Sequence, residues 1–145
     1  MKKYLNYFLI LLPLIGGIII SLLLNFDIYK EINLPSFAPP SILFPIVWSI
    51  LYLFMGIVLY RIRYHKNFLI PFILQLLLNY LWCFIFFAFQ SFLLSYIVII
   101  LLDIVVIYLL FSLYKKDMVS FYLLIPYLLW IVFASVLNWS IYLLN

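Results

Sequence analysis

Apolar residues fill the chain in five long runs separated by short polar segments. The runs cover approximately residues 4–24, 42–60, 68–89, 92–113 and 118–144. Each meets the roughly 20 residues that a helix needs to cross a bilayer. The runs are apolar on every face, whereas strands of a membrane barrel would alternate apolar and polar positions over about ten residues. The pattern therefore predicts an all-α integral membrane protein, a bundle of five transmembrane helices that forms a single domain over residues 1–145.

Composition supports lipid as the solvent of this chain. Hydrophobic residues make up 71% and charged residues 8% of the 145 positions, against roughly 25% charged residues in an ordinary soluble domain. We therefore expect the lipid bilayer as a partner. Cys83 is the single cysteine, so an intrachain disulfide is impossible. His65 is the only histidine and lies in a basic loop, so no metal site is predicted.

The first run resembles a signal peptide because Lys2 and Lys3 precede it. Its apolar stretch is longer than a typical signal core, and it ends without a small-residue cleavage site. We interpret it as a retained helix. Pro13 and the pair Gly16–Gly17 within it would permit a kink or close packing with a neighbouring helix.

The placement of charge predicts the orientation. With five spans, the N-terminus and the loops at residues 61–67 and 114–117 share one side, which carries seven of the eight basic residues. The other side carries only Lys30, accompanied by Asp27 and Glu31. The positive-inside rule then predicts a cytoplasmic N-terminus and a C-terminus outside. The net charge of +4 is explained as a topology signal, so no nucleic-acid partner is expected.

A proline-rich segment separates the first two runs. Three prolines fall within residues 35–40, and Pro45 follows shortly after. Proline lacks an N–H and biases the preceding residue away from helix, and unpaired backbone groups have no partner in hydrocarbon. We therefore expect a structured loop outside the membrane that covers a cavity as a lid, with the lid residues Pro35, Phe37, Pro39 and Pro40.

Polar and aromatic residues at membrane depth form stripes on three of the predicted helices. In each stripe, helical spacing places the residues on one face of their helix. The three stripes are Trp48, Tyr52 and Met55; Asn79, Trp82, Cys83 and Phe86; and Pro126, Trp130, Ala134 and Asn138. The stripes could converge on one cavity under the loop, suited to a flat apolar ligand with few polar atoms. Helix packing, interhelical hydrogen bonds of the two asparagines and an interfacial tryptophan belt are the alternatives.

No conventional catalytic constellation is present. The chain has no Ser/His/Asp set, no paired carboxylates and no glycine-rich phosphate loop. Asp103 is the only acid at membrane depth, and no second carboxylate or basic residue at similar depth accompanies it as a proton relay would require.

Three motifs in the correct order resemble the translocator protein family, also called tryptophan-rich sensory proteins or peripheral benzodiazepine receptors. The family's first loop, W-Y-x-x-L-x-K-P-x-W-x-P-P, is matched by residues 28–40 and followed by Pro45 and Trp48. Its L-N-x-x-W-x-x-x-F-F is matched by residues 78–87, and its P-Y-x-x-W-x-x-F-A-x-x-L-N by residues 126–138. The resemblance covers essentially the whole chain.

The resemblance implies a homodimeric membrane protein that binds porphyrins such as protoporphyrin IX, and benzodiazepine-site ligands, inside the bundle. No cofactor is required, since porphyrin is the ligand. Together with Trp82 from its stripe, the ligand-binding residues carried over are Tyr29, Trp48, Asn79, Trp130, Ala134, Leu137 and Asn138. Some bacterial members promote light-dependent porphyrin breakdown, which would make Trp48 and Trp130 the candidate catalytic residues.

The chain departs from the family pattern in its first loop. Ile28 and Phe37 replace the two loop tryptophans, and Leu34 replaces the lysine. Tyr142 is followed by no basic residue, so the sterol-recognition pattern of animal members is not supported there. The leading hypothesis is therefore a membrane receptor for porphyrins. The alternatives are a light-dependent porphyrin-degrading enzyme and a tetrapyrrole transporter, although the chain shows no inverted repeat.

Overall fold

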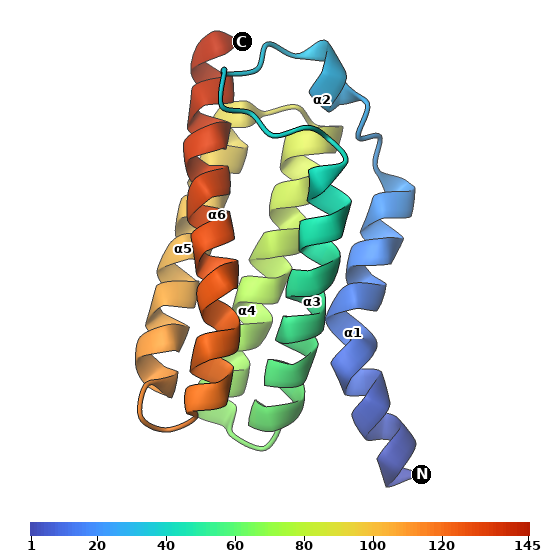
Figure 1. Ribbon diagram of the computed structural model, residues 1–145, viewed down its shortest axis with the longest axis vertical. Coiled ribbons are helices and arrows are strands. Elements are labelled where there is room, and N and C mark those ends of the chain that lie inside the picture. The colour runs from blue at the N-terminus through green and yellow to red at the C-terminus, as the bar shows by residue number, and fades with distance from the viewer.

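The chain folds into five long helices that run side by side, as the computed structural model of residues 1–145 shows (Figure 1). They are α1 (Lys2–Leu23), α3 (Leu43–Ile62), α4 (Lys66–Cys83), α5 (Phe92–Leu113) and α6 (Met118–Leu144). A short helix, α2 (Ile28–Glu31), lies between α1 and α3, and a π-helical turn, η1 (Phe84–Ala88), extends α4. No strand is present, so the prediction of an all-α fold is confirmed.

All five helices are long and apolar enough to cross a membrane, since each spans 20 to 27 residues when η1 is counted with α4. A helix suits lipid because it pairs its backbone groups within its own segment. The prediction of a multi-pass membrane protein is therefore confirmed. The first three long helices begin or end one or two residues away from the spans estimated from sequence, because polar residues can complete a helix at the membrane surface.

Around the bundle, α1 packs chiefly on α3, α3 on α6, α6 on α5, and α5 on α4. The core consists of apolar and aromatic side chains from α3 to α6, among them the fully buried Met55, Phe72, Leu102, Tyr127 and Ile131. Only Pro13 and Ile20 of α1 are buried. Because α1 lies at the periphery, its C-terminal half, which is the upper half in Figure 1, leaves space beside α3 and α4.

Close packing of α1 on α3 depends on glycine. A Cβ added to Gly56 would lie 1.6 Å from the backbone oxygen of Ile10, so any other residue there would overlap the α1 backbone. Further along the same contact, a Cβ on Gly17 would lie 2.4 Å from the ring of Tyr52. The glycine pair of the first helix therefore provides close packing, which is one of the two roles expected from the sequence.

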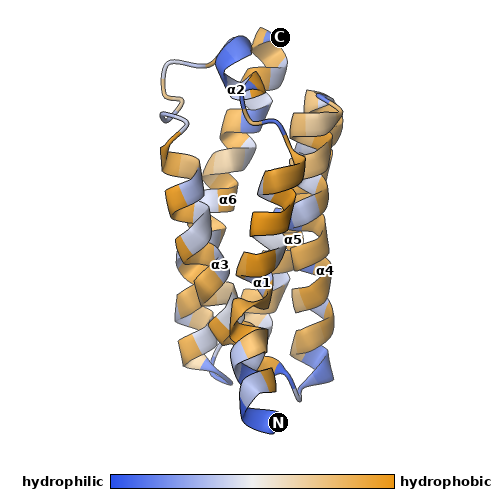
Figure 2. Cartoon of the chain, turned by 90° about the vertical axis from the view of Figure 1, so that its right-hand side faces the viewer, coloured by the Kyte–Doolittle hydropathy of each residue, from blue (hydrophilic) through white to orange (hydrophobic).

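Charged residues gather at the end of the bundle that holds the N-terminus, together with the connections α3–α4 and α5–α6 (Figures 1 and 2). There the guanidinium of Arg61 donates to both carboxylate oxygens of Asp117, with Nη2 to Oδ1 at 2.7 Å and Nε to Oδ2 at 3.0 Å. Asp117 is the N-cap residue of α6, and its carboxylate also accepts from the backbone N and the hydroxyl of Ser120. Burial raises the pKa of Asp117, but these hydrogen bonds lower it by more, so the net pKa lies below its ordinary value.

At the opposite end, residues 24–42 connect α1 to α3 and contact the end of α6 (Figure 1). Asn33 and Asn145 exchange hydrogen bonds, from Asn33 N to Asn145 Oδ1 at 3.0 Å and from Asn145 Nδ2 to Asn33 O at 2.9 Å. Asn33 Nδ2 also donates to Leu144 O at 3.3 Å. The connection is thereby held to the end of α6, through residues that follow Asn33 by 111 and 112 positions.

Candidate functional site

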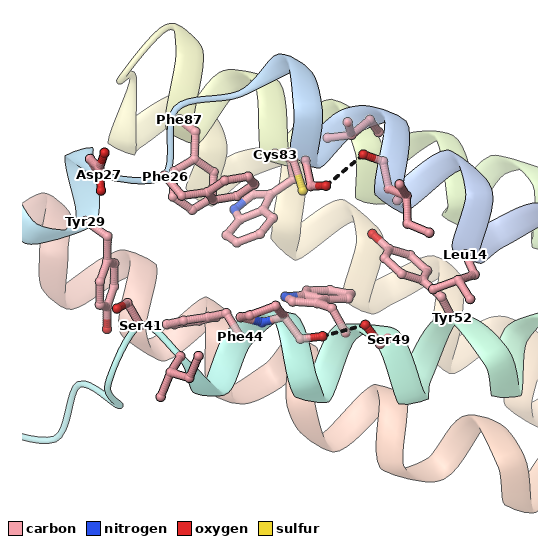
Figure 3. Close-up of a pocket in the computed structure, with 18 of the residues that line it drawn as sticks. Leu14, Phe26, Asp27, Tyr29, Ser41, Phe44, Ser49, Tyr52, Cys83 and Phe87 are labelled. Atoms are coloured by element: carbon pink, nitrogen blue, oxygen red, sulfur yellow. Dashed lines mark hydrogen bonds between the residues drawn. The ribbon is translucent and has the colours of Figure 1, made fainter.

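A cavity of about 400 Å³ lies beneath α2, between the upper half of α1 and the facing parts of α3 and α4 (Figure 3). This volume falls within the roughly 300–1,000 Å³ of typical ligand pockets. The side chains that form it are mostly apolar or aromatic, and its aromatic rings belong to Phe26, Tyr29, Phe44, Trp48, Tyr52, Trp82 and Phe87.

Two tryptophans line the cavity wall. Trp48 of α3 and Trp82 of α4 have ring centroids 6.4 Å apart. Trp48 also stacks on Tyr52, one turn further along α3, with centroids 5.4 Å apart and an interplanar angle of 29°. Aromatic faces of this kind attract a flat ring system through dispersion and offset stacking. Of the residues predicted for the site, the structure places Trp48, Trp82 and, at the upper end, Tyr29 in the cavity wall.

Tyr29 of α2 closes the upper end of the cavity. Its side chain is buried, its hydroxyl donates to the backbone oxygen of Pro39 at 2.9 Å, and its ring meets that of Phe44 edge-on at 5.1 Å. Burial raises the pKa of this hydroxyl, so it stays neutral at physiological pH. Tyr29 therefore links the connection between α1 and α3 to the first turn of α3, and it also forms part of the cavity wall.

The residues expected to form a lid lie outside the cavity lining. Pro35, Pro39 and Pro40 do not line it, and Phe37 is half exposed and meets Phe133 of α6 edge-on at 6.3 Å. The upper boundary is instead formed by residues 26–30 and 41–44. The proline segment contributes indirectly, through the carbonyl oxygen that Pro39 offers to Tyr29.

A hydrogen-bond chain lies below the cavity and includes the predicted site residue Asn79. The Tyr52 hydroxyl donates to Asn79 Oδ1 at 2.7 Å, and Asn79 Nδ2 donates to the Tyr127 hydroxyl at 3.0 Å. Tyr127 in turn donates to Gln75 Oε1 at 2.8 Å, and Gln75 Nε2 approaches the sulfur of Met55 at 3.6 Å. Asn79 is fully buried and does not line the cavity. Its amide holds α3, α4 and α6 together beneath Tyr52.

A second buried polar cluster lies behind Trp82. The indole Nε1 of Trp82 donates to Asn138 Oδ1 at 2.9 Å, and the Ser95 hydroxyl donates to the same oxygen at 3.0 Å. Asn138 Nδ2 donates to the backbone oxygen of Phe92 at 2.8 Å. The predicted residue Asn138 therefore fixes a cavity tryptophan from the side away from the cavity.

The remaining predicted residues of α6 do not reach the cavity. Ala134 and Leu137 are buried in the core. Trp130 lies in a shallow groove between α3 and α6, beside Val47 and Pro126. The ring of Phe44 stands between Trp130 and the cavity, at 5.8 Å from Trp130, and the Trp130 Nε1 has no hydrogen-bond partner.

Sequence reasoning missed several wall residues, among them Phe26 and Phe87. Phe26 and Phe87 face each other with ring centroids 4.6 Å apart and close the cavity between the end of α1 and η1. Phe87 follows Trp82 by five positions, which ordinary helical spacing does not place on the same face. The π-helical turn at residues 84–88 adds a residue to the turn and brings Phe87 round to the cavity.

Asp103 lies in the α5–α6 contact, away from the cavity. Its Oδ2 accepts from the Ser135 hydroxyl at 2.6 Å, and its Oδ1 is buried without a partner. Ser135 is also 2.9 Å from the backbone oxygen of Ile131. The pair therefore joins two helices and contributes nothing to the cavity wall.

The geometry describes an integral membrane protein of five helices with an aromatic cavity near one membrane surface. The family model described as the TspO/MBR family matches residues 9–144. This chain therefore belongs to the TspO/MBR family, as its motifs indicated.

Named relatives agree with this assignment. The chain is 44% identical to the tryptophan-rich protein TspO of Archaeoglobus fulgidus over 123 residues, which cover 81% of this chain and 79% of the relative. It is 37% identical to the tryptophan-rich protein TspO of Chlorobaculum tepidum, with 81% and 78% covered. It is 32% identical to the protein CrtK of Rhodobacter capsulatus, also with 81% and 78% covered.

Proposed function

We propose that this chain is a membrane receptor that binds protoporphyrin IX and similar flat apolar molecules in the cavity beneath α2. The observation that carries the proposal is the pair of tryptophans in the cavity wall, Trp48 and Trp82, whose rings lie 6.4 Å apart. A relative from Cereibacter sphaeroides, 28% identical over 120 residues, is named a tryptophan-rich sensory protein, which is consistent with a receptor role.

The chemistry of the cavity supports an amphipathic ligand. Its body is aromatic and aliphatic, which favours burial of an apolar ring system. Charged groups are confined to its upper edge, where Lys30 Nζ and Asp27 Oδ1 form an exposed ion pair at 2.9 Å. A macrocycle that carries carboxylates on one side matches this division, with the ring inside and the carboxylates at the charged edge.

Binding is tested by titrating protoporphyrin IX into the purified protein in detergent and following tryptophan fluorescence. The expected result is saturable quenching at one site per chain. An Asn67→Leu variant serves as the control for substitution far from the cavity, because Asn67 is exposed at the opposite end of α4. Quenching that rises linearly with the porphyrin concentration and never saturates would reject the receptor proposal.

A second function, light-dependent porphyrin breakdown, is favoured by the position of Trp48. Its indole borders the cavity and stacks on Tyr52, so an electron could pass from Trp48 to a photoexcited ligand, or to oxygen, over contact distance. Trp130 is less well placed, because Phe44 stands between it and the cavity. Illumination of the bound complex should bleach the porphyrin Soret band faster than in micelles, and Trp48→Phe should abolish that excess. Equal bleaching in protein and micelles would leave the receptor function alone.

A further inference from the structure

The cavity opens on the side of the bundle, between α1 and α3. Four exposed residues border this opening, which we name the side window: Ile18 and Ser21 from α1, Ile42 just before α3, and Ser49 from α3. Ser49 lies six residues into α3, which corresponds to about 9 Å below the start of the helix. The side window therefore extends from the membrane surface into the depth of the lipid chains.

Contacts between the helices and along the connection close most of the other boundaries of the cavity. Between α1 and η1, the rings of Phe26 and Phe87 meet at 4.6 Å. Lower down, the Tyr80 hydroxyl of α4 donates to Pro13 O of α1 at 2.7 Å. Below the side window, α1 and α3 come into direct contact where Gly56 meets Ile10. Above it, Tyr29 is fixed to Pro39. The side window is thus the open boundary of the cavity between the helices, and it continues upward to the exposed residues Asp27, Lys30 and Ser41.

The side window presents an apolar border to its surroundings. Ile18 and Ile42 are 50% and 67% exposed, so both apolar side chains are accessible to surrounding lipid. The two serines turn their hydroxyls to their own helices, Ser21 to Ile18 O at 2.7 Å and Ser49 to Pro45 O at 2.6 Å (Figure 3). Because each hydroxyl already donates its hydrogen to a carbonyl oxygen of its own helix, it has no hydrogen left to donate to water.

Charge appears only at the upper edge of the side window, where Asp27 and Lys30 lie at the level of the polar connection. A molecule that passes through the side window would therefore keep its apolar body in the lipid and the cavity throughout. Its polar end would stay beside Asp27 and Lys30. This route avoids moving an apolar surface through water, which is unfavourable in proportion to the apolar area exposed.

We infer that the ligand of this protein is a membrane-dissolved amphipath that enters sideways from the surrounding leaflet through the side window. The inference rests on the proposed function and adds the route and the ligand class. It also assigns the proline segment a different role from that of a gate. The Asn33–Asn145 contact keeps residues 33–40 in place during loading.

The test measures loading rates in vesicles. Protein reconstituted in phosphatidylcholine is mixed with vesicles carrying protoporphyrin IX, and quenching of tryptophan fluorescence is followed in time. The double variant Ser21→Phe/Ser49→Phe narrows the side window. The matched control is Ser112→Phe/Ser140→Phe, because both serines lie on α5 and α6, away from the cavity, and bond to their own helices in the same way. Asn145→Ala releases the proline segment from α6.

The expected result is a loading rate that follows the ratio of porphyrin to lipid and not the aqueous concentration. It should fall about tenfold in the side-window variant and stay unchanged in the serine control and in Asn145→Ala. Entry from water under the proline segment would instead accelerate loading in Asn145→Ala and spare the side-window variant, which would overturn the inference. A complete absence of saturable quenching in the unsubstituted chain would reject the receptor proposal itself.

Discussion

The indole nitrogen of Trp82 lies 2.9 Å from the side-chain oxygen of Asn138, so an amide on α6 fixes a tryptophan of the cavity wall on α4. The ring presents its face to the ligand space while its polar edge is satisfied behind it. Such support from a second layer of residues is what holds a binding surface in one orientation.

Substitution of Asn138 by leucine should therefore weaken porphyrin binding without removing any cavity residue. Trp82 loses its partner and gains rotational freedom, so the affinity should fall about threefold to tenfold. Trp82→Phe should cause a similar loss of affinity. The fold-loss in the double variant should be much smaller than the product of the fold-losses in the two single variants. The measurement is a porphyrin titration of the three variants. Independent, fully multiplicative effects would show that the hydrogen bond does not position the ring.

Asn79→Leu should destabilise the bundle more than it weakens binding. The substitution leaves the buried hydroxyls of Tyr52 and Tyr127 without their shared amide, at a cost of about 1–3 kcal/mol. Thermal unfolding in detergent measures the effect, and Asn67→Leu at the exposed end of α4 is the control. Equal melting temperatures for the two variants would contradict the assigned role.

Gly56→Ala should separate α1 from α3. The added methyl would lie 1.6 Å from the backbone oxygen of Ile10, and backbone cannot move aside as a side chain can. We expect a loss of about 1–3 kcal/mol and faster proteolysis of α1. Gly16→Ala is the matched control, because its methyl meets the end of the Tyr80 side chain, which can rotate away. A loss in Gly16→Ala as large as in Gly56→Ala would argue against the backbone contact.

The Arg61–Asp117 contact predicts a loss of stability in acid. The pKa of Asp117 in the folded protein lies below its ordinary value of about 3.9, so the contact contributes fully above that pH and is lost as the pH falls through the lowered pKa. The contribution should be about 1 kcal/mol or less, because Arg61 is partly exposed. Asp117→Asn should reduce the difference in the free energy of unfolding between pH 6 and pH 3. Asp27→Asn, which removes a carboxylate from an exposed pair, should leave this difference unchanged. An unchanged pH dependence in Asp117→Asn would contradict this account.

The five helices could be predicted from sequence because a bilayer accepts few alternatives to a long apolar helix. The family motifs also pointed to Trp48 and Tyr29, and helical spacing pointed to Trp82. The structure brings all three together around the cavity. Helical spacing defines which residues share a face, and it identified the faces that carry Asn79 and Asn138.

Spacing does not define which neighbour a face meets. Asn79 and Asn138 lie on the expected faces, yet their amides bond to Tyr52, Tyr127 and Trp82 and not to open space. Phe87 reaches the cavity because of a π-helical turn, which has no clear sequence signal here. The apolar residues of α1 gave no hint that this helix forms one side of the opening, because every face of it is apolar.

The central claim is that the ligand site is the cavity beside α1, bounded by Trp48 and separated from Trp130 by Phe44. The most direct test is the affinity for protoporphyrin IX of Trp48→Leu and Trp130→Leu, followed through the porphyrin Soret band so that the loss of a tryptophan does not affect the signal. Our account predicts a loss of about tenfold or more for Trp48→Leu and a loss below about threefold for Trp130→Leu. An equal or larger loss for Trp130→Leu would place the ligand elsewhere in the bundle and contradict the account.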